Sequence, residues 1–373
     1  MEKNSGKRLQ AVRDHNIKVV YNNLLEKPMS GNELAAKIGI SATSVGKIIK
    51  EMLSLGIVKI FSDNQKTKHV GRQHERYVIK GEKIYIVGIN LTYMDEFYFI
   101  CDMAGAMCFK QKLEFAYPIH KKDFDFLLND VEKTIKEILP DDAEYVFVLS
   151  IPGQVSKDTN VLLASSRMES LIDTNFSQIF YERFGKLSCV DNDVNYMLRG
   201  NMLQQMSNYS VFCFVEYGIA LSVFCNGSII MGYRGYAGEI GKNVVDGKLL
   251  KTVTTINYFL EEGKKIKPDL IPEGIVELYN NSAEFKAIIL RSAEYLAQAL
   301  CNFGNIFAFQ SISFGGIITE FGDDYFDVIQ QYFKKYSSVP VRLVCCSNVK
   351  PEKGMIKNAQ DIIIDNILAS RTE

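Results

Sequence analysis

The chain has 373 residues, of which 47% are hydrophobic and 23% charged. This length exceeds one ordinary domain, so we expect two or three folded units. No apolar run approaches the roughly 18 residues that cross a bilayer, and the polar start lacks the apolar segment of a signal peptide. The eight cysteines form no C-x-x-C pair, which predicts reduced thiols in the cytoplasm and no membrane partner.

Charge is distributed unevenly along the chain, although the net charge is only −1. Residues 1–83 hold sixteen Lys and Arg against eight Asp and Glu, whereas the remaining 290 residues hold twenty-seven against thirty-six. A basic module attached to an acidic body predicts a polyanionic partner for the first part alone. Charge by itself does not decide between a nucleic-acid partner and a chance excess of basic residues in a short domain.

Local signals predict three helices near the start of the chain. Asn16 is expected to cap the first, and Pro28 breaks the chain after it. Ser30 is a candidate cap for the second helix, which Gly39 ends. Ser41 is expected to cap the third. A helix pair with a glycine in its turn is typical of a helix-turn-helix unit.

The third helix has two different faces. Short or cationic side chains on its outer face allow close approach to phosphates and base edges, so Ser41, Thr43, Ser44 and Lys47 are candidate DNA-binding residues. Apolar residues at helical spacing should form the buried face: Val45, Ile48, Ile49, Met52 and Leu55.

Two strands, IVKIF and ERYVIK, follow and are joined by a cationic connector. Lys66, Lys68 and Arg72 in this wing are expected to contact the DNA backbone or the minor groove. The alternative is a small helical domain for protein contacts, because helix-turn-helix spacing alone matches many sequences. The helix pair, the wing and the charge excess together favour double-stranded DNA as the partner of residues 1–83.

Beyond Ile84, one order of elements occurs twice. Each pass begins with three antiparallel strands and continues with alternating helices and parallel strands, which predicts a mixed α/β sheet. We assign the first lobe to residues 84–193 and the second to residues 194–350, with a closing helix at 351–370 that returns to the first lobe. Two lobes imply a cleft between them, where a ligand is expected.

Several stretches resemble the ROK family (repressors, open reading frames and kinases), in particular its NagC/XylR-type regulators. They are IPGQV at 151–155, VDNDVN at 190–195, GYAGEIG at 235–241 and SFGG at 313–316. The winged-helix arm of ROK repressors is resembled by Arg13, Asn16, SATSVGKIIKEML and Gly71-Arg72. The resemblance implies an α/β fold class: an N-terminal winged helix-turn-helix followed by a two-lobed actin-like, sugar-kinase-like (ribonuclease H-like) ROK body.

The same resemblance implies a sugar site. The family's aspartate, the base that takes the sugar proton in its kinases, falls on Asp193, and its neighbour on Asn192. The glutamate that hydrogen-bonds sugar hydroxyls falls on Glu239, and Gly153 lies in the Pro-Gly turn whose backbone lines the pocket. Carboxylates and an amide are the acceptors and donors that a polyol needs. The alternatives are that Asp193 caps a helix and that Glu239 is a surface residue.

Departures from the family pattern decide between kinase and regulator. Asn90 stands where the first phosphate loop carries aspartate, and Thr92 and Tyr93 stand where it carries glycines. In the second loop, Glu216 and Tyr217 replace a Gly-Thr start. A phosphate cradle needs bare backbone amides, and a carboxylate would repel a triphosphate. We therefore expect no ATP binding and no enzyme activity.

The family's zinc site is also missing from the sequence. Lys242 stands at the position of a histidine ligand, and no cysteine occurs between Cys225 and Cys301. A Cys/His zinc site cannot be assembled there. We therefore expect no metal and no cofactor, and Lys242 either contacts an anionic ligand or is solvated.

Three hypotheses follow for the function. The first is a regulator, most simply a repressor of carbohydrate-utilisation genes, that binds a double-stranded DNA operator as a homodimer or tetramer and responds to a small carbohydrate or sugar phosphate. The second is an active ROK carbohydrate kinase with Asp193 as base. The third is a DNA-binding regulator whose body binds no sugar.

Overall fold

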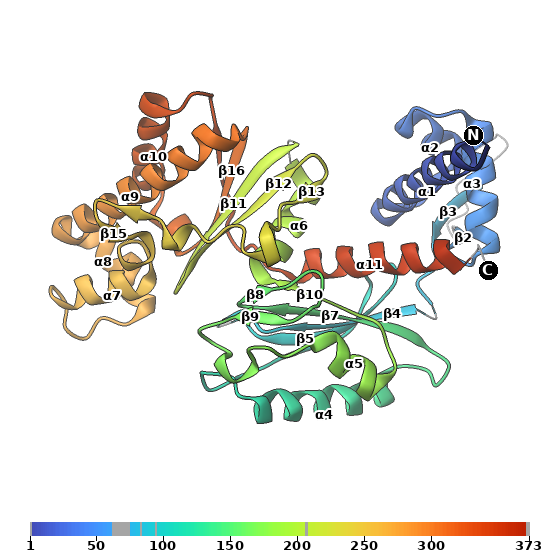
Figure 1. Cartoon of the computed structure of the whole chain (residues 1–373), viewed down its shortest axis with the longest axis horizontal. Coiled ribbons are helices and arrows are strands. Elements are labelled where there is room, and N and C mark those ends of the chain that lie inside the picture. The colour runs from blue at the N-terminus through green and yellow to red at the C-terminus, as the bar shows by residue number, and fades with distance from the viewer. Residues whose placement is uncertain (1, 62–74, 83, 94, 206–207, 371–373) are drawn as a thin grey trace, which may run out of the picture.

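A computed structural model gives the fold of the chain (Figure 1). It describes residues 2–61, 75–82, 84–93, 95–205 and 208–370. A winged helix and two α/β lobes are visible, and a long C-terminal helix, α11 (Glu352–Ala369), runs between the winged helix and the sheet of the first lobe (Figure 1). Within the described ranges, no helix combines the length and the apolar character needed to span a membrane.

In its described residues, the winged helix has three helices and a three-stranded sheet in the order β1-β3-β2. Its helices are α1 (Glu2–Glu26), α2 (Gly31–Ile38) and α3 (Ala42–Ser54), and its strands are β1 (Met29–Ser30), β2 (Val58–Phe61) and β3 (Arg76–Ile79).

The predicted caps of α2 and α3 are confirmed. Ser30 and Glu33 form a capping box at the start of α2, and Gly39 ends that helix with φ of 77°. Ser41 caps α3, since its hydroxyl oxygen accepts a hydrogen bond from the backbone N–H of Ser44 at 3.1 Å. The predicted buried face of α3 is confirmed for four of its five residues, and Leu55 is half-buried.

The prediction that Asn16 caps the first helix is wrong, because Asn16 lies inside α1. The preceding residues include Lys, Arg, Leu, Gln and Ala, which are strong helix formers, and no proline interrupts them before Pro28. A possible cap therefore does not start a helix when helix-forming residues continue upstream of it.

Each lobe repeats one topology, as the sequence predicts. In both, three antiparallel strands are followed by a strand that pairs in parallel with the first of them, and then by a strand that pairs in parallel with this fourth one. The sheet orders are β6-β5-β4-β7-β10 and β13-β12-β11-β16-β17. The first lobe contains β4 (Ile84–Asn90), β5 (Phe97–Asp102), β6 (Met107–Lys112), α4 (Lys121–Ile138), β7 (Glu144–Ile151), β8 (Gln154–Val155), β9 (Leu162–Ala164), α5 (Phe176–Phe184) and β10 (Ser188–Asn192).

The second lobe differs mainly in its helical part. This part contains three helices in the described residues, α7 (Ile256–Lys264), α8 (Ile275–Asn281) and α9 (Ala283–Phe307). The other elements are β11 (Tyr209–Val215), β12 (Ile219–Cys225), β13 (Ser228–Ile229), β14 (Val244–Val245), β15 (Lys248–Leu249), β16 (Ser311–Gly316), α10 (Asp323–Tyr336) and β17 (Arg342–Cys345).

The helix α6 (Asp193–Gln205) joins the lobes and packs closely on α11. Gly200 and Gly354 meet at this crossing, where a Cβ added to Gly354 would lie 1.9 Å from the carbonyl oxygen of Tyr196. α6 also contacts β10 of the first lobe and β11 and β12 of the second. A shift of α6 would therefore change its packing against both sheets and against α11.

The winged helix is held on α11 by several polar contacts of α1. Lys18 pairs with Asp365 at 2.5 Å, and the ammonium of Lys357 donates to the side-chain oxygen of Asn22 at 2.7 Å. The buried hydroxyl of Tyr21 donates to a backbone carbonyl in the first lobe. The apolar cores of the winged helix and α11 are continuous with one face of the first lobe's sheet.

Candidate functional sites

The outer face of α3 is polar and exposed at its N-terminal half. Thr43, Ser44 and Lys47 are all exposed, and Ser41 precedes them as the cap. Arg13 links α1 to this helix, since its guanidinium forms an ion pair with the carboxylate of Glu51 at 2.5 Å. Free amides at this end of a helix attract phosphates. The predicted wing residues Lys66, Lys68 and Arg72 lie outside the described residues.

A cavity of about 660 Å³ lies between the two lobes. It is lined by all four residues that the family resemblance assigns to the sugar: Gly153, Asn192, Asp193 and Glu239. They come from the β7–β8 turn, the end of β10, the start of α6 and a turn beyond β13. The fold thus brings these distant segments to one cleft of a size usual for small-molecule sites.

Asp193 is the more buried of the two carboxylates in this set. It is 7% exposed at the first residue of α6, and its carboxylate accepts from the Val194 N–H at 2.9 Å. Burial raises the pKa of Asp193 to about 7, against the smaller opposing effect of that hydrogen bond. At neutral pH it can therefore act as a hydrogen-bond donor or acceptor toward a ligand hydroxyl.

Asn192 and Gly153 are hydrogen-bonded to each other at the edge of the cavity. The Asn192 amide donates to the Gly153 carbonyl at 2.8 Å, and its oxygen accepts from the Val194 N–H at 2.9 Å. A Cβ at Gly153 would lie 2.7 Å from the Ala164 carbonyl oxygen, so a side chain is excluded there. The amide of Asn192 positions the Pro-Gly turn and the start of α6.

Glu239 faces the cleft from the second lobe, next to a lysine. Its carboxylate pairs with Lys242 at 3.3 Å, and the Lys242 side chain is 61% exposed. A neighbouring cavity of about 550 Å³ shares both residues with the main cleft and extends it past Lys251 and Thr255. The space open to a ligand is therefore wider than the four predicted residues indicate.

Arg167 and Ser165 also belong to the cleft, and the sequence did not reveal them. They lie in the segment after β9, where no periodic or motif signal is present. The Ser165 hydroxyl donates to the Pro152 carbonyl at 2.7 Å, which ties this segment to the Pro-Gly turn. A cation is thereby placed in a cleft that otherwise carries mainly carboxylates.

The turn after β4 is held together by hydrogen bonds among its own residues. Asn90 is fully buried, its amide donates to the Asp95 carbonyl at 2.6 Å, and its oxygen accepts from the Thr92 hydroxyl at 2.7 Å. The Asn90 side chain, which stands where the family resemblance expects an aspartate, therefore stabilises its own loop.

The turn between β11 and β12 is short and carries a carboxylate. Val215 pairs with Ile219, so only Glu216, Tyr217 and Gly218 form the turn. Burial raises the pKa of Glu216 to about 7, opposed by a hydrogen bond from the Ile317 N–H. The Glu216 carboxylate thus accepts a hydrogen bond from the backbone directly after β16, the strand that ends in SFGG.

The segment in which family members carry zinc ligands is closed by apolar packing and backbone bonds. It forms the β14–β15 hairpin, in which Val245 and Leu250 are buried and the Leu250 N–H donates to the Asn243 carbonyl at 2.8 Å. Across the part of the chain described by the structure, no three His, Cys, Asp or Glu side chains are grouped as metal ligands. The residues present do not fit zinc.

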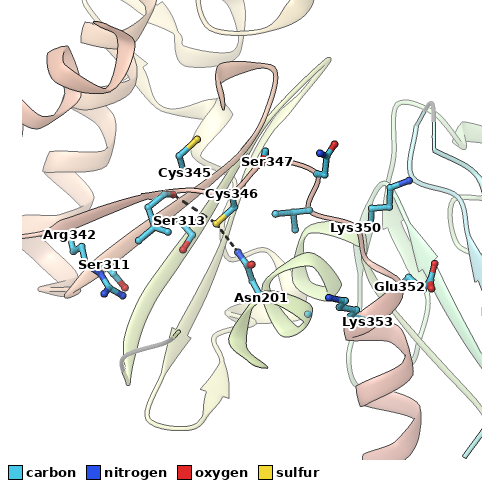
Figure 2. A pocket seen from close by; sticks show the side chains of 14 residues that line it. Asn201, Ser311, Ser313, Arg342, Cys345, Cys346, Ser347, Lys350, Glu352 and Lys353 are labelled. Carbon is cyan, nitrogen blue, oxygen red and sulfur yellow. Dashed lines mark hydrogen bonds between the residues drawn. The ribbon is translucent and has the colours of Figure 1, made fainter. Parts of the chain in front are cut away.

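A second polar cavity, of about 470 Å³, lies where α6, β16, β17 and the start of α11 meet (Figure 2). Asn201 donates to the sulfur of Cys346 at 3.2 Å inside it, and Lys350 on its rim pairs with Asp95 at 3.1 Å. Because α6 and α11 form two of its walls, a movement between these helices would change its shape.

Comparison with known proteins agrees with this architecture. No curated protein sequence matches the chain. The sequence profile of the ROK family matches residues 100–262. This matched segment carries a ROK family domain.

Solved structures extend the likeness over the whole chain. The chain is similar to a ROK family transcriptional regulator, a homologue of the E. coli MLC protein, with 18% identity and a TM-score of 0.78. That match covers 96% of this chain and 98% of the regulator. A ROK family protein from Streptococcus pneumoniae in complex with sucrose and the ROK hexokinase from Thermus thermophilus give TM-scores of 0.63 and 0.61 at 17% and 16% identity. They cover 75% and 76% of this chain, and 99% of each matched chain is aligned.

These likenesses confirm the predicted fold class, a winged helix-turn-helix on a two-lobed sugar-kinase-like ROK body. The sucrose-bound protein and the hexokinase leave about a quarter of this chain unmatched, whereas the regulator matches nearly all of it.

Proposed function

We propose that this protein is a sugar-responsive, DNA-binding transcription regulator of the cytoplasm that represses carbohydrate-utilisation genes. The observation that carries the proposal is the exposed polar face of α3, with Thr43, Ser44 and Lys47, on a winged helix joined to a clefted body. Short hydroxyls and a cation near a helix N-terminus suit contacts to phosphates and base edges in the major groove.

The cleft supports a small carbohydrate or sugar phosphate as effector. Asp193 and Glu239 offer carboxylate oxygens to ligand hydroxyls, and Arg167 adds a cation. Phosphoryl transfer depends on precise positioning of the nucleotide, and the closed turn at Asn90 and the carboxylate of Glu216 oppose it. These contacts support a body that binds a ligand without catalysis.

A connected path supports transmission from the cleft to the winged helix. A ligand at Asp193 acts on the first turn of α6, which packs on α11 at Gly354, and α11 holds α1 through the Lys18–Asp365 pair. A ligand that prefers one arrangement of the lobes would shift α11 and so reposition the α3 face.

A homodimer or tetramer fits recognition of a palindromic operator, since paired winged helices read two half-sites. The second lobe exposes apolar side chains that favour self-association: Tyr233 is 82% and Ile306 is 81% exposed. Both adjoin a largely apolar groove lined by Phe303 and Phe307. Light scattering of the wild type and of Ile306→Lys tests this assembly.

Capture of genomic fragments by the full-length protein tests DNA binding. For the selected fragment, Lys47→Ala is expected to weaken binding about fivefold to tenfold and to lower the salt dependence by about one released counterion. Lys335→Ala, which removes the same charge from α10 in the second lobe, serves as the control. Failure to capture any promoter fragment at moderate salt, or equal affinities of both variants, would contradict the proposal.

One observation favours the alternative of an active kinase. The pKa of Asp193, raised to about 7, suits a general base. Incubation with ATP and a panel of hexoses would then release ADP in the wild type and not in Asp193→Asn. We expect no ADP release from either protein, and thermal stabilisation of the wild type alone by one of the sugars.

A further inference from the structure

Four side chains form one cluster across the cleft. Tyr93, Tyr117 and Arg167 belong to the first lobe and Tyr217 to the second. The ring centroids of Tyr93 and Tyr217 are 4.6 Å apart at 88°, and those of Tyr93 and Tyr117 are 4.5 Å apart at 72°. The Arg167 guanidinium lies 3.8 Å from the centre of the Tyr93 ring and 5.6 Å from that of Tyr217.

The geometry of the cluster is favourable for attraction. Edge-to-face rings at this separation align the positive edge of one with the negative face of the other. A guanidinium over a ring face is attracted by the same quadrupole, more strongly where water is partly excluded. All four side chains are half-buried, so these contacts are partly shielded from solvent.

The backbone holds the cluster in place on both sides of the cleft. Arg167 is fixed by its N–H, which donates to the Ser165 hydroxyl at 3.2 Å, and by its carbonyl, which accepts from the Ile119 N–H at 2.8 Å. Tyr217 projects from the three-residue turn between β11 and β12, where the Glu216 N–H donates to the Gly218 carbonyl at 2.9 Å. Rigid supports reduce the entropy lost when the rings meet.

The two rings that touch between the lobes stand on the two turns in which the family resemblance expects phosphate loops. We propose that Tyr93, Tyr117, Arg167 and Tyr217 form a latch that holds the two lobes together at these turns and fills the place where a nucleotide would bridge them. Lobe closure is therefore built into the chain, and the cleft around Asp193 is formed before any ligand enters.

Hydrogen exchange of the apo protein tests the latch without DNA or sugar, so its outcome is independent of the proposed regulatory role. Tyr217→Ala is expected to raise amide exchange about tenfold in the 152–156 and 216–220 segments that face each other across the cleft. Arg167→Ala is also expected to raise amide exchange in these segments, and it serves as the test variant if Tyr217→Ala does not fold. Tyr217→Phe keeps the ring and should exchange as the wild type does.

Tyr332→Ala is the matched control. The Tyr332–Tyr336 ring pair has the same 4.6 Å separation but lies within α10 of one lobe, so its loss should leave exchange at the cleft unchanged. The double variant Tyr93→Ala/Tyr217→Ala should open the cleft by less than the sum of the two single variants, because both of these remove the Tyr93–Tyr217 contact. Unchanged exchange in Tyr217→Ala and Arg167→Ala, or additive effects of Tyr93→Ala and Tyr217→Ala, would overturn the latch.

Discussion

The α3 face and the cleft are built in opposite ways. The side chains of the α3 face lie within seven residues of one another, from Ser41 to Lys47, and a local cap and a helical repeat set their directions. The cleft collects Gly153, Asp193 and Glu239 from three separate segments, and Gly153 is held by a hydrogen bond from Asn192, 39 residues away in the chain. Surface chemistry on a single helix therefore depends on local propensity, whereas the cleft depends on how two sheets and α6 meet.

The difference also appears in what the polar groups do. On α3 the hydroxyls of Thr43 and Ser44 remain exposed beside solvent. Asn192 in the cleft and the buried Asn90 at the end of β4 use their amides to hold the protein's own backbone. Buried amides must be satisfied within the fold, which leaves fewer of them for a ligand.

The largest effect on stability is expected at Gly354, where a substitution disrupts the packing of α11 on α6 behind the cleft. Gly354→Ala forces α11 away from the Tyr196 carbonyl and is expected to destabilise the protein by about 3 kcal/mol. Gly46→Ala, on the exposed surface of α3 with nothing near its added Cβ, should stabilise by about 1 kcal/mol. Urea unfolding measures both; equal effects would remove the distinction between the two regions.

An intermediate effect is expected from the buried carboxylate of Glu216. Because its native pKa is raised to about 7 from 4.5, the native state binds more protons than the unfolded chain between these values. Stability therefore falls as pH rises through this window, and Asp193 acts in the same direction. Glu216→Gln should gain about 2 kcal/mol at pH 8 and little near pH 4.5.

Unfolding by urea at both pH values measures this difference. Glu284→Gln, an exposed glutamate in the first turn of α9, is the control and should change stability by only a few tenths of a kcal/mol. A Glu216→Gln protein that is no more stable than wild type at pH 8 would show that the carboxylate is solvated.

The smallest effect on stability is expected at Ser41, where the local origin of the α3 face can be sharpened. Ser41→Ala removes the cap and should cost about 1 kcal/mol, whereas Ser41→Asp keeps it. The added carboxylate faces the side proposed for phosphate, so Ser41→Asp should lose DNA affinity at unchanged stability. Ser30→Asp adds the same charge at the cap of α2 and should retain more affinity. Thermal unfolding and DNA titration separate the two effects, and equal affinity of the two Asp variants would rule out α3 as the reading helix.

Much of the fold could be predicted because its signals are local and repeated. Ser30, Gly39 and Ser41 mark helix ends by hydrogen bonds within three or four residues, and the two passes of strands differ in their surroundings but not in their order. Asn16 failed as a cap because a neighbouring signal, the helix-forming run before it, is stronger.

The cleft could be predicted only in part. The residues around Asp193 and Glu239 stand in motifs, and the fold places them on one cavity. Arg167 stands in no motif, and its place beside Tyr93 arises from a segment that folds back on the Pro-Gly turn. Whether the side chains of that cavity bind a sugar stays a prediction.

The amino-acid order by itself determined the three caps or stops of the winged helix, the doubled α/β topology and the replacement of glycines in both turns after β4 and β11. Those features depend on local dihedral preferences and on the alternation of apolar residues. Only the tertiary structure decided that Tyr93 and Tyr217 meet, that Asn192 holds Gly153 and that α11 joins the cleft helix to α1. Such contacts join segments far apart in the chain, and their geometry is set by the packing of whole sheets and helices.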